Sequence, residues 1–394
     1  MSDLGTAVAV NNGDNGMFFG CESLNRISFL RSDIEFIRAT MNHSSTVFVV
    51  FVNGEAVLDK DKNSILLTHL KDDTKLDDAI RKLVPLMNTA GIRMLESGVN
   101  ITFLGLMEPD KRSADVVSDN LFIHKDIYRG VPYYGIDIRP NSGTLIKPED
   151  VEHLLKMETV KRMSVFEMNN AIASLYSHAK MYLNWLGKFK YCPDCGSALY
   201  PVDGGTKLKC SNPDLTQYCE VRDLPVNNVC FPRTDPVVII AITTRDFSKI
   251  CLARNKRRIG SNVMYSTIAG FMEPAETIEK ACSREIWEET GVKCSEVSLV
   301  CSQPWPYPVN LMIGCYGIVD FNGDNEIINL NHDDEIMDAR WFDTKDISEA
   351  IDNYSGKGFV DFSMDKITFP GSTAIAHHLI KLICDKFKRS QGSL

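Results

Sequence analysis

The amino-acid sequence predicts a mixed α+β fold class, and three observations carry this prediction. Strand-like and helix-like segments alternate between residues 18 and 148, four cysteines cluster after residue 190, and strand-like runs flank a glutamate-rich helical segment in the last third. At 394 residues the chain is long enough for two or three domains. We expect an N-terminal α/β domain at 1–160 with residues 1–15 disordered, a connecting helix at 161–189, a four-cysteine module at 190–232 and a C-terminal domain at 233–394.

Composition and charge exclude several classes of protein. The apolar fraction of 44% is ordinary for a globular chain, and the net charge of −9 gives no broad basic field for nucleic acid or an anionic membrane. No apolar run approaches the roughly 18 residues that a membrane-spanning helix needs. Because the N-terminus lacks a secretory signal pattern and the cysteines are not spread like a disulfide framework, we expect an intracellular protein.

The N-terminal region is predicted to be a compact α/β domain. Residues 47–52 and 100–106 are rich in β-branched and apolar side chains, which favours strands. Residues 76–84, which stop before Pro85, and residues 148–157 are predicted helices. Because no catalytic motif occurs here, we interpret this domain as structural or dimerising. Residues 164–188 contain no proline and carry an apolar stripe, which predicts a packed connecting helix.

Four cysteines follow this helix with the spacing of a metal site. Two residues separate Cys192 from Cys195, fourteen lead on to Cys210, and eight separate that residue from Cys219. Four thiolates around a tetrahedral Zn²⁺ make a closed structural site, so we predict a zinc ribbon. Cys230 is a competing fourth ligand. Unligated cysteines and a redox Cys-x-x-Cys pair are the alternatives, and no thioredoxin-like unit surrounds the pair.

Residues 277–290 are predicted to form a helix with several carboxylates on one face. The segment contains neither Gly nor Pro, its first threonine can cap the start, and Gly291 supplies a stop. Glu285, Glu288 and Glu289 stand at i, i+3 and i+4, so they share a face. Their repulsion costs roughly a few tenths of a kcal/mol per pair, which a hard cation such as Mg²⁺ would reverse. The alternative is an acidic, solvated helix face.

The spacing pattern around this helix decides between these two interpretations. A template of glycine, glutamate, arginine and further glutamates at fixed separations runs from residue 270 to residue 292, and every position is matched. This stretch resembles the signature of the Nudix hydrolases. The resemblance implies a Nudix α/β/α sandwich, hydrolase activity and catalytic Mg²⁺ or Mn²⁺. The matching residues are Gly270, Glu276, Arg284, Glu285, Ile286, Glu288, Glu289, Gly291 and Val292.

A proline-rich aromatic stretch follows the helix. We expect a strand at 297–301 that runs into a loop with the sequence SQPWPYP at 302–308. Three prolines stiffen this loop, its rigid aromatic surface suits stacking on a flat ring, and Gln303 can bind polar edges. The alternative is a stiff loop packed on the core. A C-terminal helix is predicted from Pro370 to about Lys386, and its early amides either face a phosphate or ribose or simply dock.

Three features together indicate a narrower resemblance. The four-cysteine motif, the complete Nudix signature and the SQPWPYP stretch resemble the NADH pyrophosphatase subfamily of Nudix hydrolases over residues 160–390. The N-terminal region looks most like the fungal peroxisomal members. In such enzymes a homodimer is implied, with Phe231 reaching the site from the partner subunit.

The resemblance also implies roles for individual residues. Arg284 is expected to orient a carboxylate, with Glu276 as its partner, and Phe271 and Phe231 are expected to surround the nicotinamide. The expected catalytic residues are Glu285, Glu288, Glu289 and Arg284. The expected Mg²⁺ ligands are Glu285, Glu289, Glu335 and Glu288, and the expected Zn²⁺ ligands are Cys192, Cys195, Cys210 and Cys219. The expected substrate-binding residues are Phe231, Phe271, Gln303, Pro304, Trp305, Pro306, Tyr307, Pro308, Val309, Asn310 and Ala376.

The function implied by the resemblance is Mg²⁺-dependent hydrolysis of the diphosphate of NADH to reduced nicotinamide mononucleotide and AMP, with lesser activity on NAD and related dinucleotides. Two alternatives stay open: removal of the NAD cap from RNA 5′ ends, and a non-catalytic nucleotide-sensing module. We expect a small dinucleotide as substrate, with NAD-capped RNA as a further partner, and no membrane. Residues 392–394 match a peroxisomal address in part, so peroxisome and cytoplasm are the predicted compartments.

Overall fold

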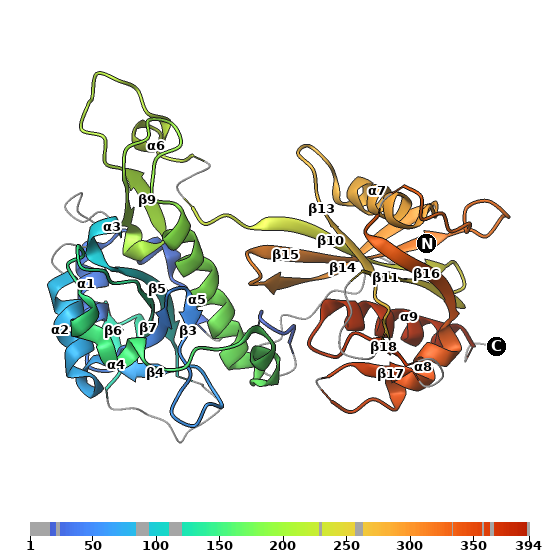
Figure 1. Ribbon diagram of the computed structural model, residues 1–394, viewed down its shortest axis with the longest axis horizontal. Helices are drawn as coiled ribbons and strands as arrows, with labels where there is room; N and C mark the ends of the chain where they lie inside the picture. Colours follow the sequence, from blue (N-terminus) through green and yellow to red (C-terminus); the bar gives the residue numbers. More distant parts are fainter. Residues whose placement is uncertain are drawn as a thin grey trace. The chain divides into compact units, whose positions relative to one another are not determined.

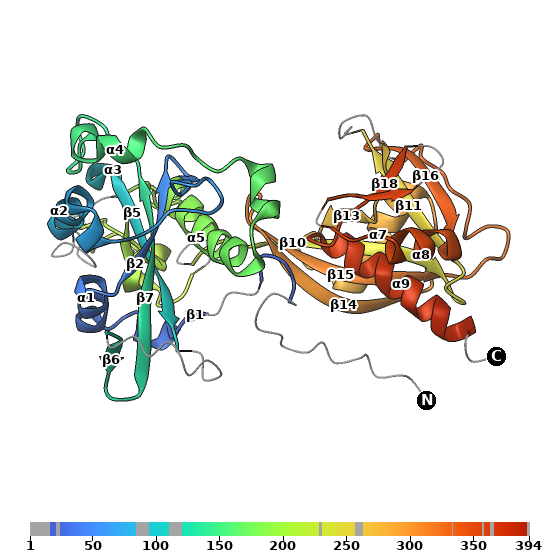
Figure 2. The same cartoon turned by 90° about the horizontal axis from the view of Figure 1, so that it is seen from below.

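The computed structural model divides the chain into two compact units (Figure 1, Figure 2). Of the residues that the structure describes, those between 24 and 233 form the N-terminal unit, and those at 16–20 and from 234 onward form the C-terminal unit. The four-cysteine module therefore belongs to the N-terminal unit. The structure describes residues 16–20, 24–83, 94–109, 120–227, 231–256, 263–332, 334–356, 358–362 and 366–391.

Three sequence-based predictions lie outside these described residues. They are the disorder of residues 1–15, the competing zinc ligand Cys230 and the peroxisomal address at 392–394. Across the described ranges, no helix has both the length and the hydropathy needed to cross a membrane.

The N-terminal unit is built on a mixed sheet in the order β1–β5–β7–β2–β3, with β4 beside β2 and β6 beside β7. Helices α1 and α2 lie on one side of this sheet and α5 on the other (Figure 2). The strands are β1 (Leu24–Asn25), β2 (Val47–Val52), β3 (Glu55–Ala56), β4 (Leu67–His69), β5 (Val99–Met107), β6 (Phe122–His124) and β7 (Tyr128–Ile138). The helices are α1 (Ile34–Asn42), α2 (Thr74–Leu83), α3 (Met94–Ser97), α4 (Glu152–Leu155) and α5 (Asn170–Lys188).

The predicted strands at 47–52 and 100–106 are confirmed in this unit. The helix predicted at 76–84 is confirmed up to Leu83, the last described residue of α2. The helix predicted over 164–188 is wrong at its start, because α5 begins only at Asn170. The Asn169 side chain accepts a hydrogen bond from the Ile172 amide at 2.9 Å, and this N-cap separates α5 from a preceding 3₁₀ turn at Arg162–Glu167. The cysteine module completes the unit with β8 (Leu199–Val202), β9 (Lys207–Cys210) and the short α6 (Glu220–Asp223).

The C-terminal unit has its main sheet between two layers of helices, with α7 on one face and α8 and α9 on the other (Figure 1). The sheet order is β14–β15–β10–β11–β16, with β13 beside β10. The strands are β10 (Asp235–Thr244), β11 (Lys249–Asn255), β13 (Ile268–Phe271), β14 (Glu296–Trp305), β15 (Asn310–Val319) and β16 (Ile336–Asp343). A smaller sheet contains β12 (Val263–Met264), β17 (Val360–Phe362) and β18 (Ile367–Phe369), and the helices are α7 (Ile278–Thr290), α8 (Thr344–Asp352) and α9 (Ile375–Gln391).

Strand β10 explains why this part of the sequence is continuously apolar. Val238 and Ile240 pack in the cluster beneath α7, whereas Ile239 and Ala241 pack in the cluster beneath α9. Successive side chains of a strand point to opposite faces, so a strand between two helix layers must be apolar at every position. The apolar run at 237–243 is by itself typical of a buried strand, and β10 contains all of it.

The sequence predicts a loop for the SQPWPYP stretch, but the first part of this stretch is a strand. Strand β14 continues through Ser302 to Trp305 and pairs antiparallel with β15, so that Gln303 lies opposite Met312. Because β14 is an edge strand, Pro304 can occupy it without removing a hydrogen bond from the sheet interior. Only residues 306–309 form the turn between the two strands.

Gln303 is fully buried and joins three segments that are distant in the sequence. Its side-chain amide donates to the carbonyls of Phe18 and Thr373, each at 2.9 Å. Its side-chain oxygen accepts from the Ile375 amide, the first of α9, at 2.9 Å. Helix α9 therefore begins at Ile375 rather than at Pro370, and Gln303 satisfies an amide that α9 itself cannot pair.

We expect Gln303→Leu to lower the free energy of unfolding of the C-terminal unit by about 3 kcal/mol. The substitution leaves two carbonyls and one amide without their partner, and each such hydrogen bond contributes about 1 kcal/mol net. Urea denaturation followed by tryptophan fluorescence measures the change. Gln391→Leu, at the exposed end of α9, is the matched control and should unfold like the wild type. An unchanged urea midpoint for the Gln303 variant would show that these three hydrogen bonds do not stabilise the unit.

Candidate active site

Helix α7 carries the acidic residues and is fixed at both ends by its own sequence. The Thr277 side chain accepts a hydrogen bond from the Lys280 amide, and Gly291 ends the helix in the left-handed region with a φ of 75°. Cys282 and Ile286 are buried against the sheet. The predicted helix at 277–290 is confirmed, and its buried stripe fixes which face holds the glutamates.

Arg284 organises the carboxylates of this region. Its Nε and Nη2 donate to the two oxygens of Glu276 at 2.8 and 2.9 Å. Its Nη1 donates to Glu285 at 2.7 Å and to Glu288 at 2.9 Å, and Nη2 also donates to the Phe271 carbonyl at 2.9 Å. Hydrogen bonding to Arg284 lowers the pKa of Glu276. One guanidinium thus connects three carboxylates and strand β13.

Gly270 explains the first position of the sequence signature. A Cβ atom at this residue would lie 1.9 Å from the carboxyl carbon of Glu285, far inside van der Waals contact. Only glycine leaves room for the carboxylate to lie against the backbone of β13. Glu285 is 8% exposed, and burial raises its pKa, although the hydrogen bond from Arg284 opposes this shift.

The remaining acidic residues differ in exposure. Glu289 is 7% exposed on α7, Glu288 is partly exposed, and Glu335 lies exposed just before β16. Among the described residues, the ligand atoms of the four cysteines lie within 4.8 Å of one another, whereas the oxygens of these glutamates do not form such a group. The arrangement nonetheless suits a divalent cation, because one arginine faces a larger number of carboxylates and carboxylate oxygen is the donor that Mg²⁺ prefers. The roles assigned to Glu285, Glu288, Glu289 and Glu335 remain predictions.

Aromatic side chains gather at the end of β14. The Trp305 and Tyr307 rings lie 6.0 Å apart, and the Phe19 ring lies 5.7 Å from the first and 6.2 Å from the second, all in edge-on geometry. Phe19, together with Phe18, was not anticipated from the sequence. The only signal was a run of three apolar residues between Gly16 and Gly20, which local pattern cannot assign to a distant strand.

The other predicted substrate-binding residues are more dispersed. Phe271 is 58% exposed at the end of β13, whereas Ala376 is buried in the first turn of α9. The side-chain oxygen of Asn310 is buried without a hydrogen-bond partner at the start of β15. Phe231 belongs to the N-terminal unit, so its pairing with Phe271 stays a prediction, as does a substrate contact for Gln303. The substrate-binding roles expected for the turn residues Pro306, Pro308 and Val309 and for the strand residue Pro304 likewise stay predictions.

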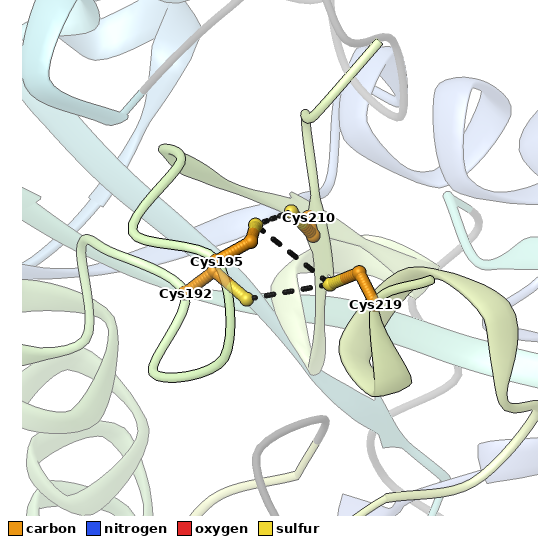
Figure 3. Close-up of side chains that lie close together, drawn as sticks. All are labelled: Cys192, Cys195, Cys210 and Cys219. Carbon is orange, nitrogen blue, oxygen red and sulfur yellow. Dashed lines mark hydrogen bonds between the residues drawn. The ribbon is translucent and has the colours of Figure 1, made fainter. Parts of the chain in front are cut away.

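The four cysteines predicted to bind metal converge (Figure 3). The Cys192 and Cys219 sulfurs are 3.6 Å apart, those of Cys195 and Cys210 are 3.3 Å apart, and those of Cys195 and Cys219 are 3.8 Å apart. Zinc–sulfur bonds of about 2.3 Å in a tetrahedron place the sulfurs about 3.8 Å apart, so the cluster is compatible with zinc. Cys219 is therefore part of the cluster despite its distance from Cys210 in the sequence.

Comparisons with known proteins agree with this site. A family model described as the NUDIX domain matches residues 233–360. A Saccharomyces cerevisiae protein named NAD-capped RNA hydrolase NPY1 is 52% identical over 376 residues, which cover 94% of this chain and 96% of that protein. A Schizosaccharomyces pombe protein named NAD-capped RNA hydrolase is 30% identical over 384 residues, covering 95% and 94%. The human protein named NAD-capped RNA hydrolase NUDT12 is 36% identical over 219 residues, covering 55% and 43%. The chain therefore belongs to the family of these relatives, and it is a Nudix hydrolase.

Proposed function

We propose that this enzyme hydrolyses the diphosphate of the NAD cap at RNA 5′ ends, yielding nicotinamide mononucleotide and RNA with a 5′ monophosphate. The observation that carries the hydrolytic chemistry is the set of carboxylates that Arg284 holds on α7 beside Gly270. The choice of substrate is supported by the names of relatives that match this chain over nearly its whole length.

Free NADH, which the sequence-based prediction placed first, is the second candidate. The bond to be broken is the same, and the net charge of −9 works against binding a long RNA unless a local basic groove compensates. The names of the relatives favour the capped RNA over the free dinucleotide.

The residues of α7 would hold the cation and activate water. Glu285 and Glu289 would bind Mg²⁺ or Mn²⁺, with Glu335 as a further ligand. The cation would neutralise diphosphate charge and would lower the pKa of water. Arg284 fixes one oxygen of Glu285 and one of Glu288, which preorganises both carboxylates. Glu288 or Glu289 takes the proton of the attacking water, and the added water separates the two phosphates.

The structural metal ion and the oligomeric state are part of the same proposal. The four cysteines would hold a structural Zn²⁺, because four soft thiolate donors at these separations suit that ion. We also propose a homodimer, as the subfamily resemblance implies. The peroxisome or the cytoplasm as compartment stays a prediction.

Product analysis by chromatography tests the proposed substrate. The purified protein with Mg²⁺ is given NAD-capped RNA, NADH, NAD⁺ and ADP-ribose at matched concentrations, with a triphosphate RNA of the same sequence as control. We expect the fastest cleavage for the capped RNA and none for the control. Fastest release of AMP from NADH would favour the second candidate, and cleavage of none of the dinucleotide substrates would contradict both.

We expect Glu289→Gln to reduce the hydrolysis rate by about 10²- to 10⁴-fold, the range for losing a general base. The amide keeps the size of the side chain but removes the charge that a cation or a proton needs. Steady-state kinetics measures the loss, and circular dichroism checks that the fold is retained. Glu279→Gln, at an exposed position of the same helix, is the matched control. Similar rates for the two variants would exclude a catalytic or metal-binding role for Glu289.

Gly270→Ala should lower the rate by about 10²-fold, because the new methyl group displaces the Glu285 carboxylate by an ångström or more. The rate is measured on the best substrate from the product analysis. Gly358→Ala serves as the control, since a Cβ there would meet nothing within 4 Å and the residue has no positive φ. Wild-type activity of the Gly270 variant would show that the position of Glu285 does not matter for the reaction.

A further inference from the structure

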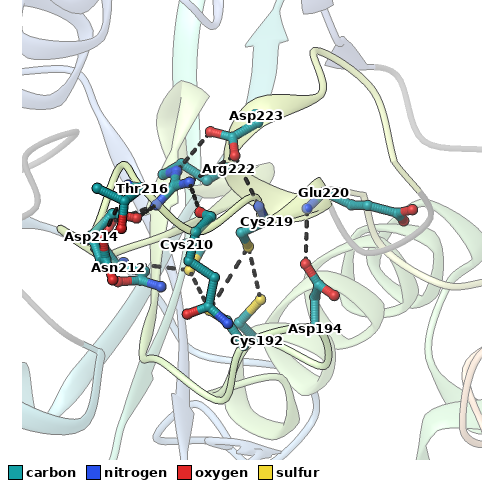
Figure 4. Close-up of polar contacts among 12 residues, drawn as sticks. Cys192, Asp194, Cys210, Asn212, Asp214, Thr216, Cys219, Glu220, Arg222 and Asp223 are labelled. Atoms are coloured by element: carbon teal, nitrogen blue, oxygen red, sulfur yellow. Dashed lines mark hydrogen bonds and ion pairs between the residues drawn. The ribbon is translucent and has the colours of Figure 1, made fainter.

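The segment between Cys210 and Cys219 has eight residues where a compact second cysteine knuckle would have two, and it is nevertheless closely ordered (Figure 4). Asp214 accepts hydrogen bonds from the amide and the hydroxyl of Thr216, at 2.9 and 2.6 Å. Asn212 accepts one from the Asp214 amide at 3.0 Å. These local turns order the segment between the two cysteines.

Arg222 donates hydrogen bonds to three main-chain carbonyls of this segment. Its Nη1 donates to Asn212 and Asp214 at 3.3 and 2.6 Å, and its Nη2 donates to Gln217 at 2.5 Å. Nε and Nη2 donate to the two oxygens of Asp223 at 2.6 and 2.7 Å. Only 13% of the Arg222 side chain is exposed. This is more than a surface ion pair, which would contribute little, because one planar guanidinium joins three main-chain carbonyls and a carboxylate.

The same carboxylate reaches the metal-ligating residue. Asp223 accepts a hydrogen bond from the Cys219 amide at 2.9 Å. The next amide, that of Glu220, donates at 2.9 Å to Asp194, which lies between the first two cysteines of the cluster. Both amides around Cys219 are thus held by carboxylates, one tied to Arg222 and the other to the first knuckle.

We propose that Arg222 and Asp223 are positioning residues for metal binding, which hold the Cys219 sulfur near the other three sulfurs in place of a short second knuckle. Without them, closing a long loop onto the cluster would depend on the metal alone, at a cost in chain entropy that grows with loop length. Residues that orient metal ligands typically change metal affinity by about 10- to 100-fold when they are replaced. The inference rests on the proposed zinc ion, and it is independent of the proposed substrate.

The test uses the full-length protein loaded with zinc. Zinc content is measured by mass spectrometry, and the rate of zinc release to a chromogenic chelator is compared for the wild type, Arg222→Lys and Arg222→Gln. We expect release to be about 10- to 100-fold faster in both variants. Lysine keeps the charge but cannot present the planar fork of donors, so it should not rescue the site. If the Arg222→Gln variant does not fold, the rate of zinc release from Arg222→Lys tests the proposal alone.

Arg245→Lys is the matched control. Arg245 also donates to both oxygens of one carboxylate, Asp320, at 2.7 and 3.0 Å, but it belongs to the C-terminal unit. Zinc release from this variant should match the wild type. Wild-type release rates in the Arg222 variants, or equal acceleration by Arg245→Lys, would overturn the inference. Wild-type protein that binds no zinc would instead overturn the zinc proposal on which it rests.

Discussion

The mutual repulsion of carboxylates on one helix face is the constraint on which the site depends. Helix α7 buries Cys282 and Ile286 against the sheet. This orientation leaves the carboxylates of Glu285, Glu288 and Glu289 close enough to repel one another. Arg284 relieves part of the repulsion by hydrogen bonding to two of these glutamates, and the remaining negative charge is what a divalent cation would neutralise. The charge that weakens the isolated helix is therefore the charge that the proposed chemistry would use.

The sheet converts this local arrangement into a positioned site. Strand β13 brings Gly270 under the Glu285 carboxylate, and its last carbonyl, that of Phe271, accepts from Arg284. On the other face, Gln303 ties the edge strand β14 to the start of α9 and to Phe18. A buried side chain with all of its hydrogen bonds made is a rigid connector, so the aromatic end of β14 is held by the same fold that holds the acidic helix.

The two units hold chemically different donor sets. The cysteine cluster offers soft sulfur with every ligand position taken by protein, which suits a structural zinc, whereas α7 offers hard oxygen that suits Mg²⁺. Each set is ordered by an arginine that forks between carboxylates and main-chain carbonyls: Arg284 in the C-terminal unit and Arg222 in the N-terminal unit. In both units the planar guanidinium joins groups that the backbone alone would leave apart.

The family signature, the α7 helix with its caps and the apolar strand β10 can all be predicted from the sequence, because each depends on short-range spacing. The sequence also predicts that the four cysteines form one cluster. It does not predict the loop geometry that allows eight residues between Cys210 and Cys219. Only the tertiary structure showed that SQPWPYP is largely strand, that Gln303 binds the main chain of Phe18, and that Asn169 starts α5 later than the pattern suggested. Strand pairing and buried hydrogen bonds join residues that are far apart in the chain, and no local pattern records such partners.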